Sequence, residues 1–172
     1  GATAAPALTG RSRMRYAEYR PSAPLAQWVR CYWVLECAAA DVSPEPERVL
    51  PDGCTEIIVH YGDPFRRLVE WGRTVSQRRA LFAGQLERCL LLVPEGAVGM
   101  FGVRFEPAGV RPFVDVALTD VVGHVLALDE VWGAAGVTFE DRIGSAGEDQ
   151  RRGAGGEGAL LRPPDAARPT PG

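Results

Sequence analysis

Thr55-Glu-Ile-Ile-Val-His-Tyr61 follows directly on the turn sequence Leu50-Pro-Asp-Gly-Cys54. The heptapeptide is rich in β-branched residues and predicts a strand whose odd-numbered side chains share one face. Glu56, Ile58 and His60 then share the other face, so two polar side chains flank an aliphatic one. The structural turn before the strand is assigned to Pro51, Asp52 and Gly53.

Other short segments with strand character lie on both sides of this strand. Turns rich in Gly, Pro or Arg separate them at intervals of about 8–12 residues, a spacing that favours a small antiparallel barrel or sandwich. The predicted strands are Cys31–Cys37, Leu68–Trp71, Ala80–Ala83, Cys89–Val93 and Val98–Phe105.

The pattern becomes helical after Phe105. Short helices are expected over Pro107–Val116 and Leu118–Leu126, a longer one over Asp129–Ile143, and a short early helix beginning at Ser22. Strands followed by helices predict an α+β domain with the helices on one side of the sheet.

The two ends differ in composition from the centre. Residues 1–13 show neither helical nor strand periodicity and read as a flexible leader, which makes Met14 a candidate start. Residues 144–172 contain seven Gly, four Pro and no aromatic residue, which predicts a disordered tail. A natural tail and a truncated or frame-shifted end both fit this composition. The predicted folded unit is therefore residues 14–143.

Charge argues against a dedicated nucleic-acid binder. The 172 residues carry a net charge of −3, and all 19 basic residues are Arg. Residues 31–145 hold ten Arg against seventeen Asp and Glu, so the predicted folded unit repels a phosphate backbone.

Cysteine usage and hydropathy indicate a cytoplasmic protein. Cys31, Cys37, Cys54 and Cys89 form neither a C-x-x-C pair nor a zinc-finger spacing, so reduced thiols are expected. No apolar run approaches the length of a membrane span, and the N-terminus lacks the apolar region of a signal peptide.

No catalytic signature is present, so an enzyme is not expected and no cofactor is implied. A metal site would have to recruit Glu56 and His60 with Asp52 or Cys54, and this set lacks the paired spacing of zinc ligands. The sequence therefore predicts no metal, and Glu56 and His60 are interpreted as a polar pair lining the sheet.

Arg104 stands on a predicted strand whose other face is apolar. An inward guanidinium requires a carboxylate partner, and Asp52 and Glu56 are the candidates. The pair is either structural or part of a site that recognises an anion or an amide. Adding Trp33 as an aromatic wall gives four candidate ligand-binding residues: Trp33, Glu56, His60 and Arg104.

The ordered set of segments resembles the N-terminal sensor domain of a subgroup of AraC-type bacterial transcription regulators. The resemblance covers residues 14–143, and its most specific part is Leu50-Pro-Asp-Gly-Cys54 with its strand, some 20 residues after Cys31-Tyr-Trp33. The other matching segments are Met14–Pro21, Phe82–Gly84, Gly102–Phe105, Leu118–Asp120 and Leu128–Gly133.

This resemblance implies a small antiparallel, cupin-like β-barrel followed by short helices. It also implies sensing of a small-molecule effector or self-association as a homodimer. DNA is expected to be bound only through a C-terminal helix-turn-helix domain of about 100 residues, and the 29 residues after position 143 cannot form one. The alternative is a stand-alone small-molecule-binding or enzymatic β-barrel. The effector, the regulated genes and the oligomeric state are left open.

Overall fold

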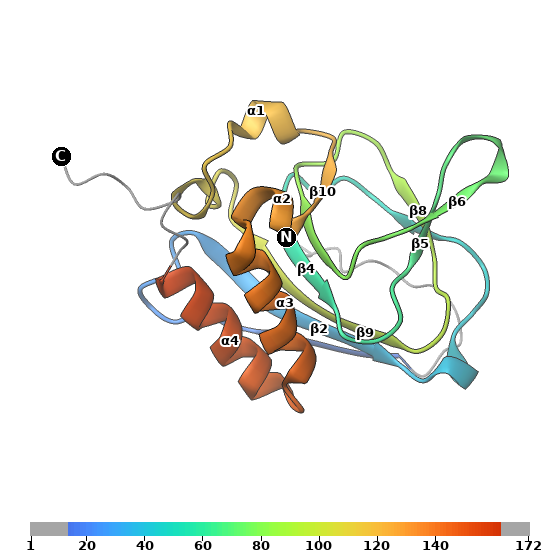
Figure 1. Ribbon diagram of the computed structural model, residues 1–172, viewed down its shortest axis with the longest axis horizontal. Coiled ribbons are helices and arrows are strands. Elements are labelled where there is room, and N and C mark those ends of the chain that lie inside the picture. Colours follow the sequence, from blue (N-terminus) through green and yellow to red (C-terminus); the bar gives the residue numbers. More distant parts are fainter. Residues whose placement is uncertain (1–13, 163–172) are drawn as a thin grey trace.

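The computed structural model describes residues 14–162 as ten strands and four α-helices, joined by short 3-10 turns (Figure 1). The predicted leader, residues 1–13, and the end of the predicted tail, residues 163–172, lie outside the described residues.

The larger sheet contains six antiparallel strands in the order β1-β2-β9-β4-β7-β10. In chain order these strands are β1 Arg15–Tyr19, β2 Val29–Cys37, β4 Glu56–His60, β7 Ala80–Ala83, β9 Val98–Phe105 and β10 Val125–Ala127. The central strand β9 pairs with β2 on one side and β4 on the other, and its register sets Glu56 opposite Arg104. Residues 40 or more positions apart in the sequence thus become direct cross-strand neighbours.

The smaller sheet is also antiparallel, in the order β3-β8-β5-β6. Its strands are β3 Glu47–Val49, β5 Arg66–Leu68, β6 Thr74–Ser76 and β8 Leu90–Val93. Within residues 14–162, no strand of this sheet hydrogen-bonds to a strand of the larger sheet. The predicted α+β class is confirmed. The strands form two separate sheets, which are compatible with a cupin-like sandwich, and over residues 14–162 they do not close into a barrel.

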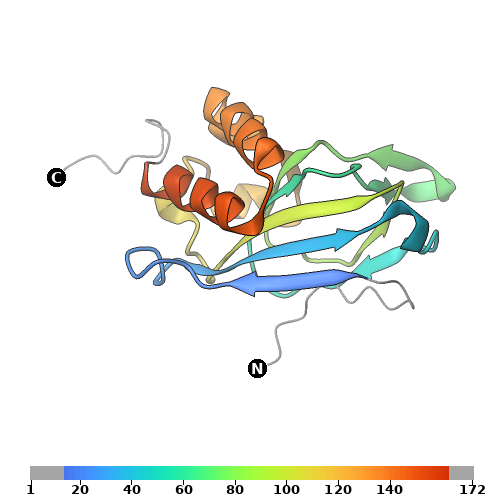
Figure 2. The same ribbon diagram turned by 90° about the horizontal axis from the view of Figure 1, so that it is seen from below.

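Helices cover the face of the larger sheet that points away from the smaller sheet (Figures 1 and 2). They are α2 Leu128–Trp132, α3 Ala134–Ser145 and α4 Asp149–Leu161, while α1 Leu118–Val121 lies apart from them. The 3-10 turns are Ala39–Asp41, Glu70–Gly72 and Arg111–Phe113. Two apolar cores result, one between helices and sheet that includes Phe82, Phe101 and Phe105, and one on the inter-sheet face that includes Trp33, Leu35 and Met100.

Several predicted elements differ in the structure. The helix expected over Pro107–Val116 is replaced by turns and the 3-10 turn Arg111–Phe113. The helix expected over Asp129–Ile143 is broken at Gly133, whose φ of 57° interrupts helical geometry and separates α2 from α3. The stretch Leu118–Leu126 is divided between α1 and the start of β10. The strand expected over Leu68–Trp71 ends at Leu68, because Trp71 adopts a φ of 64° in a 3-10 turn.

The early helix predicted from Ser22 is a series of turns. The Leu25 amide donates to the Ser22 carbonyl at 3.0 Å, and Val29 donates to Leu25 before β2 begins. A stretch this short gains too few hydrogen bonds to propagate a helix before the strand register takes over.

Disorder was predicted from residue 144 onward, and this is wrong for the helical residues up to Leu161. Helix α3 continues to Ser145, and α4 follows despite four Gly in thirteen residues. Contacts to distant strands hold α4. Asp149 accepts hydrogen bonds from Arg15 and Tyr19, and Glu157 accepts from the Tyr32 hydroxyl at 2.9 Å. The composition of this segment does not reveal these partners, because they lie more than 120 residues away in the sequence.

The Arg152 side chain adds a further contact between α4 and the sheet. Its guanidinium carbon lies 3.7 Å from the centre of the Tyr61 ring, and its side chain is buried. Burial of an Arg over an aromatic face stabilises docking of the helix.

No helix in the described range is long and apolar enough to cross a membrane. The four cysteines are unbridged: Cys31, Cys37 and Cys54 are buried, and Cys89 is exposed.

Candidate functional site

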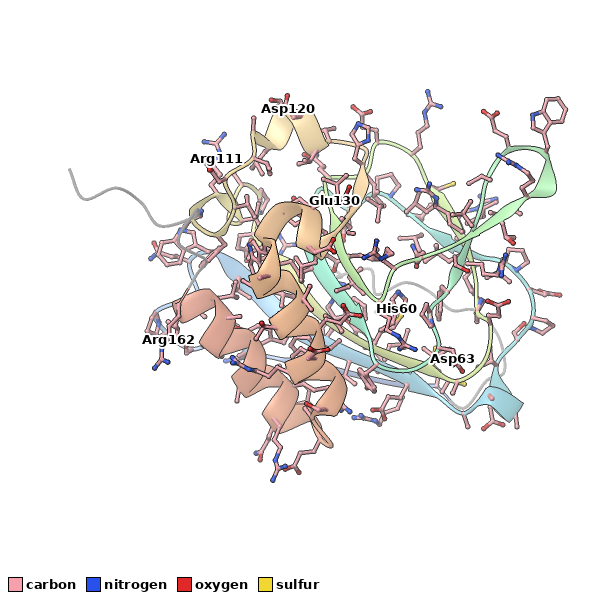
Figure 3. All side chains as sticks on the ribbon, in the orientation of Figure 1. His60, Asp63, Arg111, Asp120, Glu130 and Arg162 are labelled. Atoms are coloured by element: carbon pink, nitrogen blue, oxygen red, sulfur yellow. The ribbon has the colours of Figure 1, made fainter. Side chains whose placement is uncertain are left out.

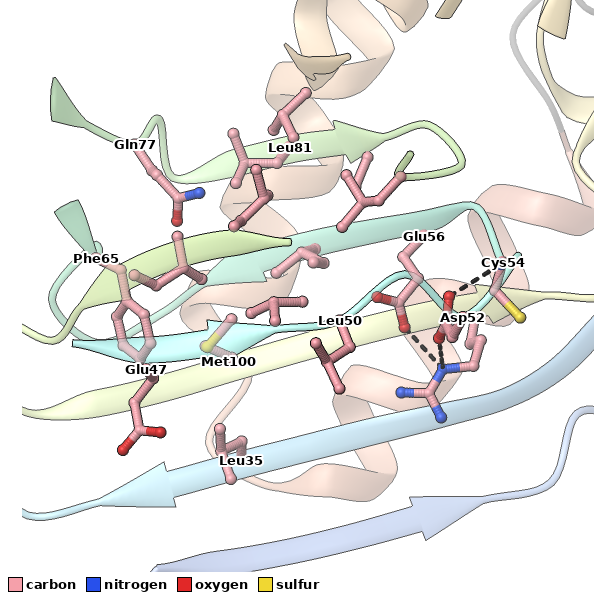
Figure 4. A pocket seen from close by; sticks show the side chains of 18 of the residues that line it. Leu35, Glu47, Leu50, Asp52, Cys54, Glu56, Phe65, Gln77, Leu81 and Met100 are labelled. Atoms are coloured by element: carbon pink, nitrogen blue, oxygen red, sulfur yellow. Dashed lines mark hydrogen bonds and ion pairs between the residues drawn. The ribbon is translucent and has the colours of Figure 1, made fainter. Parts of the chain in front are cut away.

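A cavity of about 130 Å³ lies between the two sheets (Figure 4). Its lining includes all four candidate residues from the sequence, namely Trp33, Glu56, His60 and Arg104. These side chains come from three adjacent strands of the larger sheet, so the topology gathers residues spread over more than 70 positions.

Strand alternation explains why these side chains face the cavity. On β4, Ile57 and Val59 belong to the helix-side core, which turns Glu56, Ile58 and His60 toward the smaller sheet. The same alternation on β9 turns Phe101 and Val103 toward the helices and Met100 and Arg104 toward the cavity. On β2, it places Trp33 and Leu35 beside them.

Arg104 and Glu56 form an ion pair at one end of the cavity, in which Arg104 is buried and Glu56 is half-buried. Arg104 is 1% exposed, and its Nε donates to Glu56 Oε1 at 2.8 Å. The Trp33 indole Nε1 donates to the same oxygen at 3.0 Å. One carboxylate oxygen thus orients both the guanidinium and the indole.

Two further carboxylates surround Arg104. An oxygen of Glu18 lies 3.7 Å from Nη1, and an oxygen of Asp52 lies 4.0 Å from Nε. Both partners considered from the sequence, Glu56 and Asp52, are therefore present. Glu18 was not foreseen, because β1 was not predicted as a strand.

The turn before β4 sets the position of Asp52. Its Oδ1 accepts the Cys54 backbone N–H at 2.9 Å, and Gly53 has a φ of 77°. This local hydrogen bond bends the chain where Pro51, Asp52 and Gly53 were expected to turn it. The other Asp52 oxygen is the one that lies nearest Arg104.

Burial and mutual attraction act in opposite directions on the ion pair. Burial raises the pKa of the Glu56 carboxyl, and the positive charge of Arg104 works against that rise. Burial by itself would lower the pKa of Arg104, but the attraction of Glu56 outweighs it and the pKa is raised. Arg104 is therefore a permanent cation whose charge is directed at carboxylates of the protein.

His60 lies in the interior of the molecule (Figure 3). It lines the cavity beside Phe65, which Figure 4 shows at the end away from Glu56. It is 1% exposed, and its ring centre is 5.6 Å from that of Phe65. Burial is the main cause that lowers its pKa from 6.5 to about 4, and the nearby Gln77 opposes part of this shift. The ring is therefore neutral at pH 7.

Neither ring nitrogen of His60 has a hydrogen-bond partner among residues 14–162. A neutral imidazole carries one N–H donor and one acceptor. An unpaired buried polar group is unfavourable, and such groups in native proteins point to an unseen partner such as water or a ligand. Both nitrogens are available to such a partner in the cavity.

The middle of the cavity is apolar. Side chains from both sheets form it: Leu35, Ile58, Leu81, Leu92 and Met100. In Figure 4, Leu35, Leu81 and Met100 lie between Glu56 and Asp52 at one end and Phe65 and Gln77 at the other. The lining from the smaller sheet and from Leu81 was not assigned from the sequence, because only the tertiary structure brings the second sheet over the first.

In the part of the chain that the structure describes, no three His, Cys, Asp or Glu side chains gather closely enough to hold a metal ion. Glu56 and His60 share a face but are four residues apart on an extended strand, about 13 Å at ~3.3 Å per residue. The metal set considered from the sequence is therefore not assembled.

The fold and the site together define the class of the protein: a two-sheet α+β domain with an apolar cavity between its sheets and polar groups at both ends. The chain belongs to the family described as Domain of unknown function (DUF6597), which matches residues 17–127. This match spans both sheets and ends where β10 ends, before the helices α2–α4. No curated protein and no solved structure matches the chain.

Proposed function

We propose that this chain is the effector-sensing domain of an AraC-type transcription regulator that acts in the cytoplasm. The cavity between the sheets carries the proposal. Apolar walls with a few convergent polar groups are the usual composition of small-molecule sites, and here Trp33, Glu56, His60 and Arg104 converge on one such space. The resemblance of the segments between residues 14 and 143 supplies the regulatory context.

In this proposal, the effector binds between the sheets and changes the state of the domain. A helix-turn-helix domain outside this chain reads the DNA, and self-association as a homodimer belongs to the same proposal. A ligand can shift the regulator only by binding one of its conformations more tightly than the other.

A cavity-filling variant tests the proposal. Ala83 on β7 lines the cavity, so Ala83→Leu should occupy part of the space and raise the melting temperature without ligand. A library of small organic compounds should then contain members that stabilise the wild type but not this variant. Ala134→Leu, at an exposed position of α3, is the matched control and should keep the response.

Fusion of the chain to an AraC-type helix-turn-helix domain tests the regulatory part. Compounds that stabilise the isolated chain should change the output of a transcriptional reporter, and Ala83→Leu should abolish the change. Compounds that stabilise the wild type and Ala83→Leu equally would locate binding elsewhere and contradict the proposal.

The alternative, a stand-alone enzymatic domain, has less support. A catalytic base normally contacts the nucleophile that it activates, and among residues 14–162 neither ring nitrogen of the buried His60 makes a hydrogen bond to such a group.

A further inference from the structure

The charges at one end of the cavity are unbalanced. Arg104 contacts three carboxylates: those of Asp52 and Glu56, which line the cavity, and that of Glu18, which does not. Of the other guanidiniums nearby, that of Arg30 pairs with Glu106 at 3.1 Å. The positive charges of Arg104 and Arg30 are therefore already paired with carboxylates of the protein, while Asp52 and Glu56 share Arg104.

Two other charged residues line the cavity along β3. Glu47 and the exposed Arg48 are opposite in sign and leave the net charge of the lining unchanged, and Figure 4 shows Glu47 beside Phe65, at the end away from Asp52. A carboxylate ligand placed beside Arg104 would also lie close to Asp52 and Glu56, which is unfavourable at short range.

The end of the cavity that contains Asp52 and Glu56 is also accessible to solvent. The side chain of Asp52 is 33% exposed, that of Glu56 is 18% exposed, and Leu50 on the rim is 61% exposed. An ammonium group bound beside Asp52 would keep part of its hydration, so the cost of desolvating it is small.

The opposite end supplies the second, independent observation. His60 is 1% exposed and lines the cavity. Neither of its ring nitrogens has a hydrogen-bond partner among the described residues. A neutral hydroxyl on a ligand can donate to one ring nitrogen or accept from the other.

The size of the cavity limits the apolar body between the two ends. Its volume is about 130 Å³, and an apolar cavity of about 150 Å³ is known to hold one benzene ring. Four residues of extended strand separate Glu56 from His60 by about 13 Å. One ring with a short arm fits these limits.

We infer that the cavity selects a small organic amine, with one ring as its apolar body, whose ammonium meets Asp52 and Glu56 and whose neutral polar group meets His60. This inference rests on the proposed sensing function and specifies the ligand class of the same site.

Four probes of similar size test the inference by calorimetry on the 172-residue chain at pH 7. Tyramine carries an ammonium and a phenol, tyrosol replaces the ammonium by a hydroxyl, and para-hydroxyphenylacetate replaces it by a carboxylate. Phenethylamine keeps the ammonium and lacks the phenol. Tyramine should bind about tenfold more tightly than para-hydroxyphenylacetate, with tyrosol between them.

Two variants assign the contacts. Asp52→Asn keeps the acceptor for the Cys54 amide and should weaken tyramine about fivefold while leaving tyrosol unchanged. Asp115→Asn, exposed and outside the cavity lining, is the control and should change neither. His60→Phe should reduce the affinity for tyramine to that for phenethylamine, a loss of about fivefold.

Equal or tighter binding of para-hydroxyphenylacetate would overturn the inference, as would an unchanged preference for tyramine in Asp52→Asn. Failure of all four probes would also overturn it. The proposed sensing function would survive either result if library compounds still stabilised the wild type and not Ala83→Leu. If they did not, both would fall.

Discussion

At the scale of single residues, the Arg104–Glu56 pair dominates the energetics of the cavity. Three carboxylates depend on Arg104 for compensation, whereas Glu56 has two donors, Arg104 Nε and Trp33 Nε1. The two partners therefore should not be equivalent on mutation. Removing the cation leaves several like charges close together, while neutralising Glu56 leaves its carbonyl acceptor in place.

Arg104→Met should lower the free energy of unfolding by roughly 3–5 kcal/mol, as expected when one member of a buried pair is removed. Glu56→Gln should cost about 1–2 kcal/mol, because the Gln oxygen still accepts from both donors and Arg104 keeps Glu18 and Asp52 nearby. Urea denaturation of both variants at pH 7 measures the difference. Equal losses would show that the pair contributes as an isolated unit.

The buried His60 should make stability depend on pH. Its pKa falls from 6.5 to about 4 on folding, so between these values the unfolded chain binds a proton that the folded protein does not. Stability from this residue is complete above about pH 6.5 and is lost as the pH falls toward 4. Over that window the loss amounts to roughly 3 kcal/mol.

His60→Phe should remove this component while preserving contact with Phe65, and at pH 7 it should be neutral or stabilising because an unpaired polar group is lost. Unfolding curves of wild type and variant from pH 4 to 7 isolate the difference, since the other titrating groups are common to both. Parallel pH profiles would mean that folding leaves the pKa of His60 unchanged.

At the scale of elements, α4 shows how tertiary contacts override composition. Four Gly weaken the helix by about 0.5–1 kcal/mol each relative to Ala, yet Asp149, Arg152 and Glu157 attach it to β1, β2 and Tyr61. Some of the glycines have a packing role and others do not.

Gly153 and Gly156 form a matched pair for testing this. A Cβ on Gly153 would have no atom within 4 Å, whereas one on Gly156 would lie 3.2 Å from the Phe101 ring and 3.3 Å from the Tyr32 ring. Gly153→Ala should stabilise the protein by about 0.5–1 kcal/mol, and Gly156→Ala should gain less or lose stability. Hydrogen exchange of the α4 amides reports the local change. Equal gains would contradict close packing of α4 on the sheet.

At the scale of the whole molecule, the distribution of charge bears on DNA binding. Residues 31–145, which supply most of both sheets, carry ten Arg and seventeen acidic residues. Excess negative charge repels the phosphate backbone.

This chain alone should therefore show no sequence-specific affinity for DNA near physiological salt. Fluorescence anisotropy with the promoter of its own gene, against a scrambled duplex of equal length, measures this. Submicromolar binding that distinguishes the two duplexes would refute the expectation and place a DNA reader inside these 172 residues.

Much of the architecture could be derived from local pattern. Alternation around β4 and β9 determined which face Glu56, His60 and Arg104 share, because side chains on a strand alternate regardless of what packs against them. The change from strands to helices after Phe105 determined the α+β class. The four candidate site residues line one cavity for the same reason: their strands are neighbours in the sheet, and each side chain points to the same face of it.

What only the tertiary structure decided depends on contacts between distant segments. The strand pattern left a barrel and a sandwich open, and pairing and packing produced two sheets with a cavity between them. Glu18 joined Arg104, and α4 formed from a Gly-rich stretch, because strand register and helix docking bring together groups that are far apart in sequence. Local propensity contains no information on such partners, and their energies are large enough to reverse what it predicts.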